Sequence, residues 1–118
     1  MLDHTTLIVW QRARGVVLAT LALGRTSWKP YAAAVFNQLL RASLSVQLNI
    51  AEGYAVRLPR RRRFHWNVAY GSSVETVDRL ELLRDGGVIG PSLIDPTIEL
   101  ARETSRMLLK MIRQMEPH

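Results

Sequence analysis

The residues with the clearest chemical potential are arginines. Five of them fall within a short stretch, at Arg57 and at every position from Arg60 to Arg63. Planar guanidinium groups match phosphate oxygens, and the His65-Trp66 pair that follows offers an aromatic ring for stacking on a base. Four like charges in the first turn of a helix oppose the positive end of the helix dipole. Such an unfavourable interaction between charges and helix dipole indicates a binding partner whose negative charge compensates it. The hypothesis is that these arginines bind RNA, DNA or another polyanion. The alternative is that they are only the solvent-exposed start of a helix.

A second set of polar residues repeats at helical spacing within residues 38–53, at steps of 3, 4, 4 and 3. Polar groups between packed helices each cost about 1–3 kcal/mol when they lack a partner. Two polar residues of the next helical segment could supply partners, and the preferred interpretation is structural. This predicted polar seam comprises Gln38, Arg41, Ser45, Asn49, Glu52, Ser72 and Glu75.

Metal and catalytic motifs do not fit the sequence. A di-iron bundle requires Glu-x-x-His on two helices, but Ala55 follows Glu52 at that spacing and Asp78 follows Glu75. The run at residues 71–73 lacks the Gly-Lys-Ser ending of a phosphate-binding loop, and no serine stands in a glycine-flanked nucleophile elbow. We expect no metal, no cofactor and no enzymatic activity.

Composition is typical of one all-α domain over residues 1–118. Cysteine is absent, which excludes disulfides and thiolate metal sites. The first residues lack the pattern of a signal peptide, and no apolar run reaches the roughly 18 residues of a membrane span. We therefore expect a cytoplasmic protein without membrane contact. The net charge is +6, and residues 57–63 alone carry five positive charges.

Apolar periodicity predicts four helices joined by short links, which favours an antiparallel up-down-up-down four-helix bundle. The alternative is an array of helical hairpins that closes only as an oligomer. Gly24 is the expected C-terminal cap of the first helix, with a loop at 25–29. A start of the fourth helix at Ser92 stays open. The expected helices are Thr5 to Leu23, Pro30 to Val56, Pro59 to Asp85, and a fourth capped by Asp95 and beginning at Pro96.

Three finer expectations follow from the same pattern. Gly71 should allow a close approach between helices, and Trp66 should lie in the core. Along the fourth helix, Glu99–Arg102 and Glu103–Arg106 should form pairs at i,i+3 spacing.

The second helix carries one apolar arc more than a single bundle can bury, marked by Leu44, Leu48 and Ala51. Exposed apolar patches of this kind mark interfaces. We expect self-association through the second helix, and through the fourth.

Two blocks of residues carry a resemblance to a known family. They are Gln38, Arg41-Ala42, Ser45-Val46 and 49–53 (Asn-Ile-Ala-Glu-Gly) in the second helix, and Ala69, Gly71-Ser72 and Glu75 in the third. The chain resembles the four-helix-bundle proteins encoded in intervening sequences of large-subunit ribosomal RNA genes. It departs from them at Leu40, where a second basic residue is usual, and at Gly87-Val88, where Gly-Tyr is frequent.

The resemblance implies a homopentamer around a central axis and no enzymatic activity. A related branch, the accessory variability proteins of diversity-generating retroelements, is basic, pentameric, and partners a reverse transcriptase and its RNA. The resulting hypothesis is a non-catalytic oligomer that binds RNA or DNA, or assists a nucleic-acid enzyme, through the arginine-rich turn between the second and third helices. The alternative is a structural scaffold or adaptor for an acidic protein partner.

Overall fold

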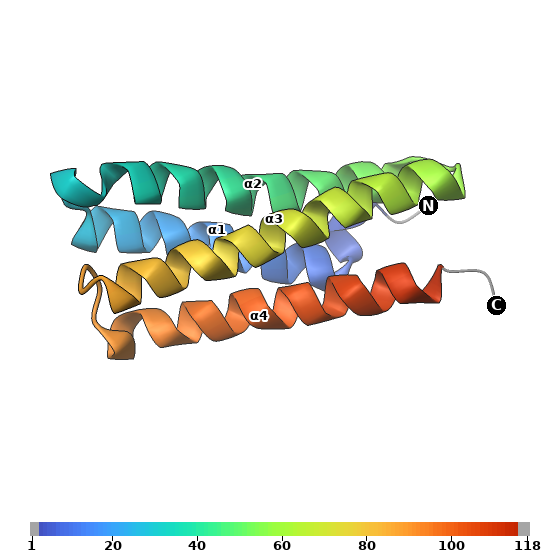
Figure 1. The fold of residues 1–118 in the computed structure, drawn as a ribbon. Helices are drawn as coiled ribbons and strands as arrows, with labels where there is room; N and C mark the ends of the chain where they lie inside the picture. The colour runs from blue at the N-terminus through green and yellow to red at the C-terminus, as the bar shows by residue number, and fades with distance from the viewer. Residues whose placement is uncertain (1–2, 116–118) are drawn as a thin grey trace.

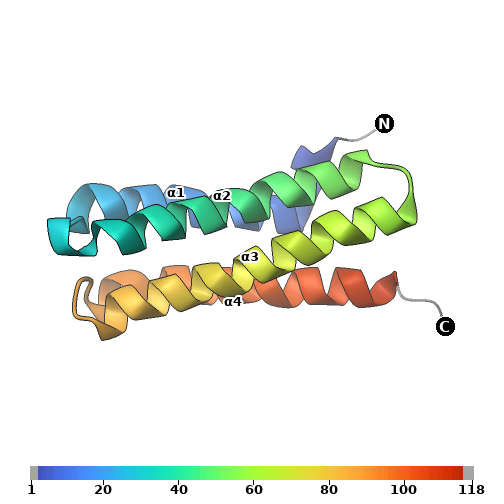
Figure 2. The same ribbon diagram turned by 45° about the horizontal axis from the view of Figure 1, so that its top comes forward.

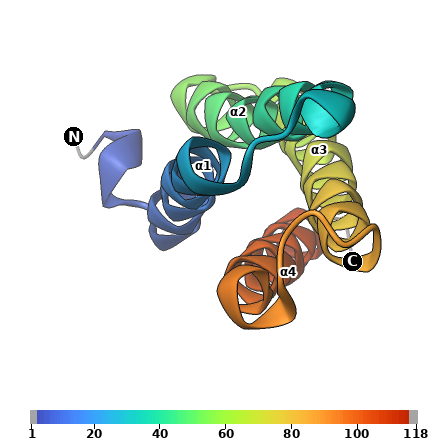
Figure 3. The ribbon, with the colours of Figure 1, turned by 90° about the vertical axis from the view of Figure 1, so that its left-hand side faces the viewer.

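The computed structural model describes residues 3–115 and shows an all-α, up-down-up-down bundle of four long helices (Figures 1 and 2). Seen along the bundle axis, the four helices follow one another around a ring, and the last packs against the first (Figure 3). The bundle measures 45 × 27 × 22 Å. Its helices are α1 (Ile8–Ser27), α2 (Ala33–Ala55), α3 (Pro59–Asp85) and α4 (Pro91–Gln114), with short 3-10 helices η1 (His4–Thr6) and η2 (Pro30–Ala32).

The predicted end of the first helix is wrong. Gly24 lies inside α1, which continues to Ser27, and the predicted loop shrinks to two residues. The terminating residue is Pro30, because a proline disfavours the helical conformation in the residue before it, and Lys29 is extended. At the other end, Leu7 is also extended, so α1 begins at Ile8 and the residues before it form η1.

The predicted cap of the fourth helix is also wrong. The helix begins at Pro91, one residue before the alternative start, and Pro96 lies inside it at the cost of one backbone hydrogen bond. Asp95 does not cap the helix, because it lies inside α4, and its carboxylate accepts a hydrogen bond from Arg84 Nη1 at 3.1 Å. Hydrogen bonds to Asp85 and Asp95 raise the pKa of Arg84. The bond to Asp95 joins the end of α3 to the start of α4.

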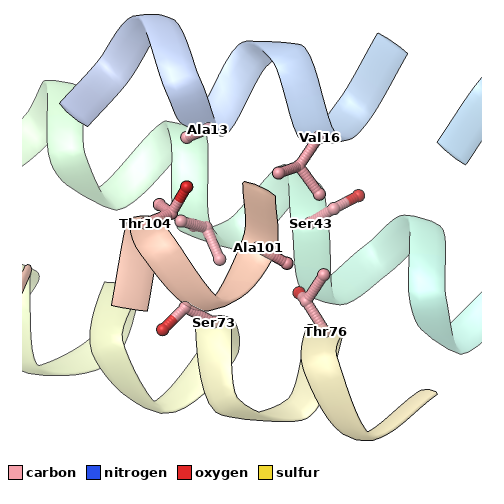
Figure 4. A pocket seen from close by; sticks show the side chains of 8 residues that line it. Ala13, Val16, Ser43, Ser73, Thr76, Ala101 and Thr104 are labelled. Carbon is pink, nitrogen blue, oxygen red and sulfur yellow. The ribbon is translucent and has the colours of Figure 1, made fainter. Parts of the chain in front are cut away.

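The core consists of two apolar clusters on either side of a layer of hydroxyl side chains. These hydroxyls bond to carbonyls of their own helices, as Ser43 does to Leu40 at 3.0 Å and Thr104 to Leu100 at 2.9 Å. Ser43, Ser73, Thr76 and Thr104 thus meet at mid-bundle with their hydroxyls paired. The buried hydroxyl of Thr20 on α1 has no hydrogen-bond partner within residues 3–115. A cavity of about 10 Å³ remains at mid-bundle, lined by Ala13, Val16, Ser43, Val46, Ser73, Thr76, Ala101 and Thr104 (Figure 4).

Two glycines mark close approaches between helices, and neither is Gly71. A Cβ at Gly15 would meet Leu100 Cδ2 at 3.2 Å, and a Cβ at Gly53 would lie 2.5 Å from the ring of Trp66. A Cβ added at Gly71 would meet no neighbouring helix within 4 Å, so the expectation of a close approach at that residue is wrong. Trp66 is buried, as predicted, against the end of α2.

Within residues 3–115, no helix is both long enough and apolar enough to cross a lipid bilayer.

The contact at Gly53 leads to a stability prediction. Gly53→Ala should lower the free energy of unfolding by about 1–3 kcal/mol, because the added methyl group overpacks the site and displaces the indole ring. The ring cannot shift without disturbing the hydrogen bond from Trp66 Nε1 to the Ile50 carbonyl, 3.4 Å away. Guanidinium unfolding followed by circular dichroism measures the change.

Gly24→Ala is the matched control, because Gly24 also lies inside a helix but has open space around it. There the higher helix propensity of alanine should raise stability by up to about 1 kcal/mol. Equal effects of the two substitutions would contradict the importance of the Gly53–Trp66 contact.

Candidate nucleic-acid interface at the turn between α2 and α3

Three residues connect α2 to α3 in a tight, extended turn. Val56 and Leu58 are both extended, and Pro59 occupies the first position of α3. Proline fits there because its missing N–H would have no partner inside the helix. The arginine run therefore occupies the first turn of α3, beside the end of α2.

Arg62 does not point into solvent. Its Nε donates to the carbonyl of Gly53 at 2.9 Å, and its Nη2 donates to those of Tyr54 at 3.0 Å and Val56 at 3.1 Å. The guanidinium also lies 5.6 Å from the ring centre of Trp66. The last carbonyls of a helix lack intrahelical partners and carry partial negative charge. Arg62 thus closes the C-terminus of α2.

Arg63 makes a similar contact with a different helix. Its Nη2 donates to the carbonyl of Met115 at 3.1 Å, directly after α4. Its Nε is buried and has no hydrogen-bond partner within residues 3–115. The first turn of α3 is therefore joined to the C-termini of both α2 and α4, and this geometry offsets part of the unfavourable dipole of α3.

The remaining three arginines of the run have a different environment. Arg57, Arg60 and Arg61 are exposed, and within residues 3–115 they make no hydrogen bond or ion pair. Their charges are available to an external anion. The sequence placed five arginines in one candidate site, and the structure divides them into three exposed groups and two that bond to helix ends.

Phe64 is a member of this surface that the sequence analysis missed. Its side chain is 64% exposed, and it lines a shallow hollow together with Leu58, Pro59, Arg60 and Arg61. The aromatic residue named in the sequence analysis, Trp66, is instead 8% exposed and faces the core. The helical spacing of Phe64 from Arg60, one turn earlier, was the signal that could have found it.

Part of the polar seam lies next to this turn. His65 Nδ1 is 3.1 Å from Asn49 Oδ1 and 3.4 Å from Glu52 Oε2. Asn49 in turn donates from Nδ2 to the carbonyl of Ser45 at 2.9 Å. These contacts link α2 to the second turn of α3, immediately behind the exposed face of the arginine run.

The rest of the seam continues along the boundary between α2 and α3. The hydroxyls of Ser45 and Ser72 are 2.8 Å apart, and Arg79 Nε donates to Gln38 Oε1 at 3.0 Å. Arg41 and Glu75 are exposed and form no ion pair within residues 3–115, although they line one hollow. The structure thus brings five of the seven seam residues into direct contacts between α2 and α3: Gln38, Ser45, Asn49, Glu52 and Ser72.

Charge is distributed unevenly along the bundle. The half that holds the turn between α2 and α3 comprises residues 3–17, 44–72 and 103–115, with ten basic and three acidic side chains. The other half, residues 18–43 and 73–102, holds six of each. The whole net positive charge of the described residues therefore lies in one half, where the potential attracts polyanions.

Within residues 3–115, no three potential metal ligands gather at one point.

Comparison with known proteins identifies the family. The model of the 23S rRNA-intervening sequence proteins matches residues 5–110 of the chain. The chain belongs to this family. The match confirms the resemblance carried by the two sequence blocks in α2 and α3. No curated protein sequence matches the chain closely enough to count as a relative.

Two neighbouring arginines of this family member should respond differently to the same substitution. Arg62→Gln should lower the free energy of unfolding by about 2 kcal/mol, because it removes a charged donor from the carbonyls at the end of α2. Arg61→Gln, one residue earlier and exposed, should change stability by less than about 0.5 kcal/mol. Thermal and guanidinium unfolding of the two variants against the parent measures both effects. A loss of equal size in both variants would contradict the role assigned to Arg62.

Proposed function

We propose that the protein is a non-catalytic, nucleic-acid-binding member of its family, and that it acts as a homo-oligomer. Its contacts are made to phosphate groups of RNA or DNA by Arg57, Arg60 and Arg61. The observation that carries the proposal is the concentration of the whole net charge in one half of the bundle, with these three arginines exposed and unpaired. Family membership supports a connection with RNA.

The geometry favours contacts with the phosphate backbone over recognition of base sequence. Sequence-specific reading of a duplex needs an element that enters a groove, and the short turn between α2 and α3 provides no such element. Phosphate contacts alone give weak, salt-sensitive binding. Oligomerisation would repeat the turn in every subunit and increase avidity without new contacts. Such a protein fits the role of an accessory to a nucleic-acid enzyme, as the resemblance to the reverse-transcriptase accessory proteins implies.

Self-association is the second part of the proposal. On α2, Leu44 is 46% exposed and Leu48 is 56% exposed, and with Ala51 and Trp10 they border one hollow. A second copy of the chain is the occupant that would cover these residues. The resemblance to the family makes a pentamer the expected assembly.

Charge removal at the turn tests the binding site. A variant with Arg57, Arg60 and Arg61 changed to Gln should lose most of its affinity for RNA. Its plot of log affinity against log salt should become less steep by about 2 units, at roughly 0.7 per phosphate contact on a single strand. Fluorescence anisotropy over a salt series measures both quantities.

The control removes two exposed basic residues from the opposite half: Arg25 and Lys29, each changed to Gln. This variant changes only residues at the far end of the bundle from the turn, farther away than the Debye length of about 10 Å at 0.1 M salt. Its affinity should stay close to that of the parent. Equal losses in both variants would reject the site, and absence of parent binding to RNA and DNA at low salt would reject the function in favour of an adaptor for acidic proteins.

Charge introduced on α2 tests the self-association. Leu44→Glu combined with Leu48→Glu should dissociate the oligomer into monomers of 13.4 kDa, because burial of two carboxylates in an apolar interface is unfavourable. Size exclusion with light scattering measures the mass, and circular dichroism checks that the helices persist. Leu82→Glu, an exposed leucine of α3, is the control. A parent protein that is monomeric at every micromolar concentration would overturn this part of the proposal.

A further inference from the structure

Phe64 has an exposure that the fold does not require. Its side chain is 64% exposed on the second turn of α3, and within residues 3–115 its one ring contact is edge-on, to His65 at 5.5 Å. Large aromatic side chains are normally buried to a much greater extent. An aromatic ring that contributes little to the core and stands in a charged surface suggests a role in binding.

The neighbours of Phe64 indicate which class of ligand this surface binds. It follows Arg60 and Arg61 by four and three residues, so all three side chains share one face of α3. They line the same hollow, together with Leu58 and Pro59. Two guanidinium groups next to an aromatic face form the combination that contacts both parts of a nucleotide, the phosphate and the base.

We propose that the turn between α2 and α3 selects unpaired nucleotides, with Phe64 stacked on a base while Arg60 and Arg61 hold the adjacent phosphates. The inference rests on the proposed function and specifies its ligand. In a duplex the faces of the bases are covered by their neighbours in the stack, and an aromatic side chain reaches them only in single strands, loops, bulges or ends. The ligand class is therefore single-stranded or locally unpaired RNA or DNA, without strong sequence preference.

A second copy of the chain fits this surface less well than a polyanion does. Burying Phe64 in an interface between subunits would also bury the adjacent unpaired arginines, and a buried charge without a partner is costly. The acidic side chains that could neutralise them lie mainly in the opposite half of the bundle, where basic residues equal them in number. Charge complementarity thus favours a phosphate-bearing partner.

The test compares one RNA in two forms, a strand of about 12 nucleotides without self-complementarity and the same strand annealed to its complement. The parent should bind the single strand more tightly than the duplex. Phe64→Ala should weaken binding to the single strand by roughly five- to 150-fold, the range expected for loss of one stacked base, and leave binding to the duplex unchanged. Phe64→Tyr should retain the preference, because it keeps the aromatic face.

Leu82→Ala is the control for loss of an exposed apolar side chain from α3, and it should affect neither RNA. Equal affinity of the parent for both forms, or an equal effect of Phe64→Ala on both, would overturn the inference while leaving the proposed function intact. A change of oligomer mass in Phe64→Ala would also overturn it, because Phe64 would then belong to a subunit interface. A parent that binds neither form at low salt would remove the proposed function itself.

Discussion

The geometry of the candidate interface depends on the contact between the end of α2 and the first turns of α3. Arg62 donates to the carbonyls of Gly53, Tyr54 and Val56, which would otherwise lack partners at a helix end. Gly53 lets Trp66 pack directly against the backbone of α2, because any Cβ at that position would meet the indole ring. Together these contacts fix the direction in which α3 leaves the turn. The positions of the exposed arginines follow from that direction.

The same contacts explain how the first turn of α3 tolerates so many positive charges. Arg62 and Arg63 each reach the negative end of a neighbouring helix, so their charges meet carbonyl oxygens. Arg57, Arg60 and Arg61 have no such compensation and face solvent. Elsewhere some charges pair between helices, as in the bridges from Arg12 to Glu103 and from Arg102 to Glu81. The net positive charge of residues 3–115 lies in the half of the bundle that holds the turn, which is the surface of the proposed function.

The sequence by itself determined the architecture and the family. Apolar residues at helical spacing predicted the four helices, and Pro59 and the Gly86-Gly87 pair predicted the two ends of α3, because these residues act on the local backbone alone. Pro30 opens the short 3-10 helix η2, and α2 begins three residues later, at Ala33. Short links then left an antiparallel bundle as the simplest arrangement. Residues that are compatible with two different local structures predicted the helix boundaries less reliably. Gly24 is compatible with a helix interior as well as a cap, and either Pro91 or Pro96 could open the last helix, so their outcomes depended on the neighbouring elements.

Only the tertiary structure decided which residues of the arginine run face solvent. Consecutive residues of a helix point about 100° apart. Arg62 and Arg63 therefore turn inward once the C-termini of α2 and α4 lie beside them, and the end of α4 is 52 residues away from Arg63 along the chain. The same constraint buries Trp66 and exposes Phe64. It also replaced the pairs expected along α4, because Arg102 and Glu103 bridge to other helices and Arg106 pairs with Glu99. Spacing in a sequence defines the face on which a side chain lies, and the packing of the neighbouring helices decides what that face meets.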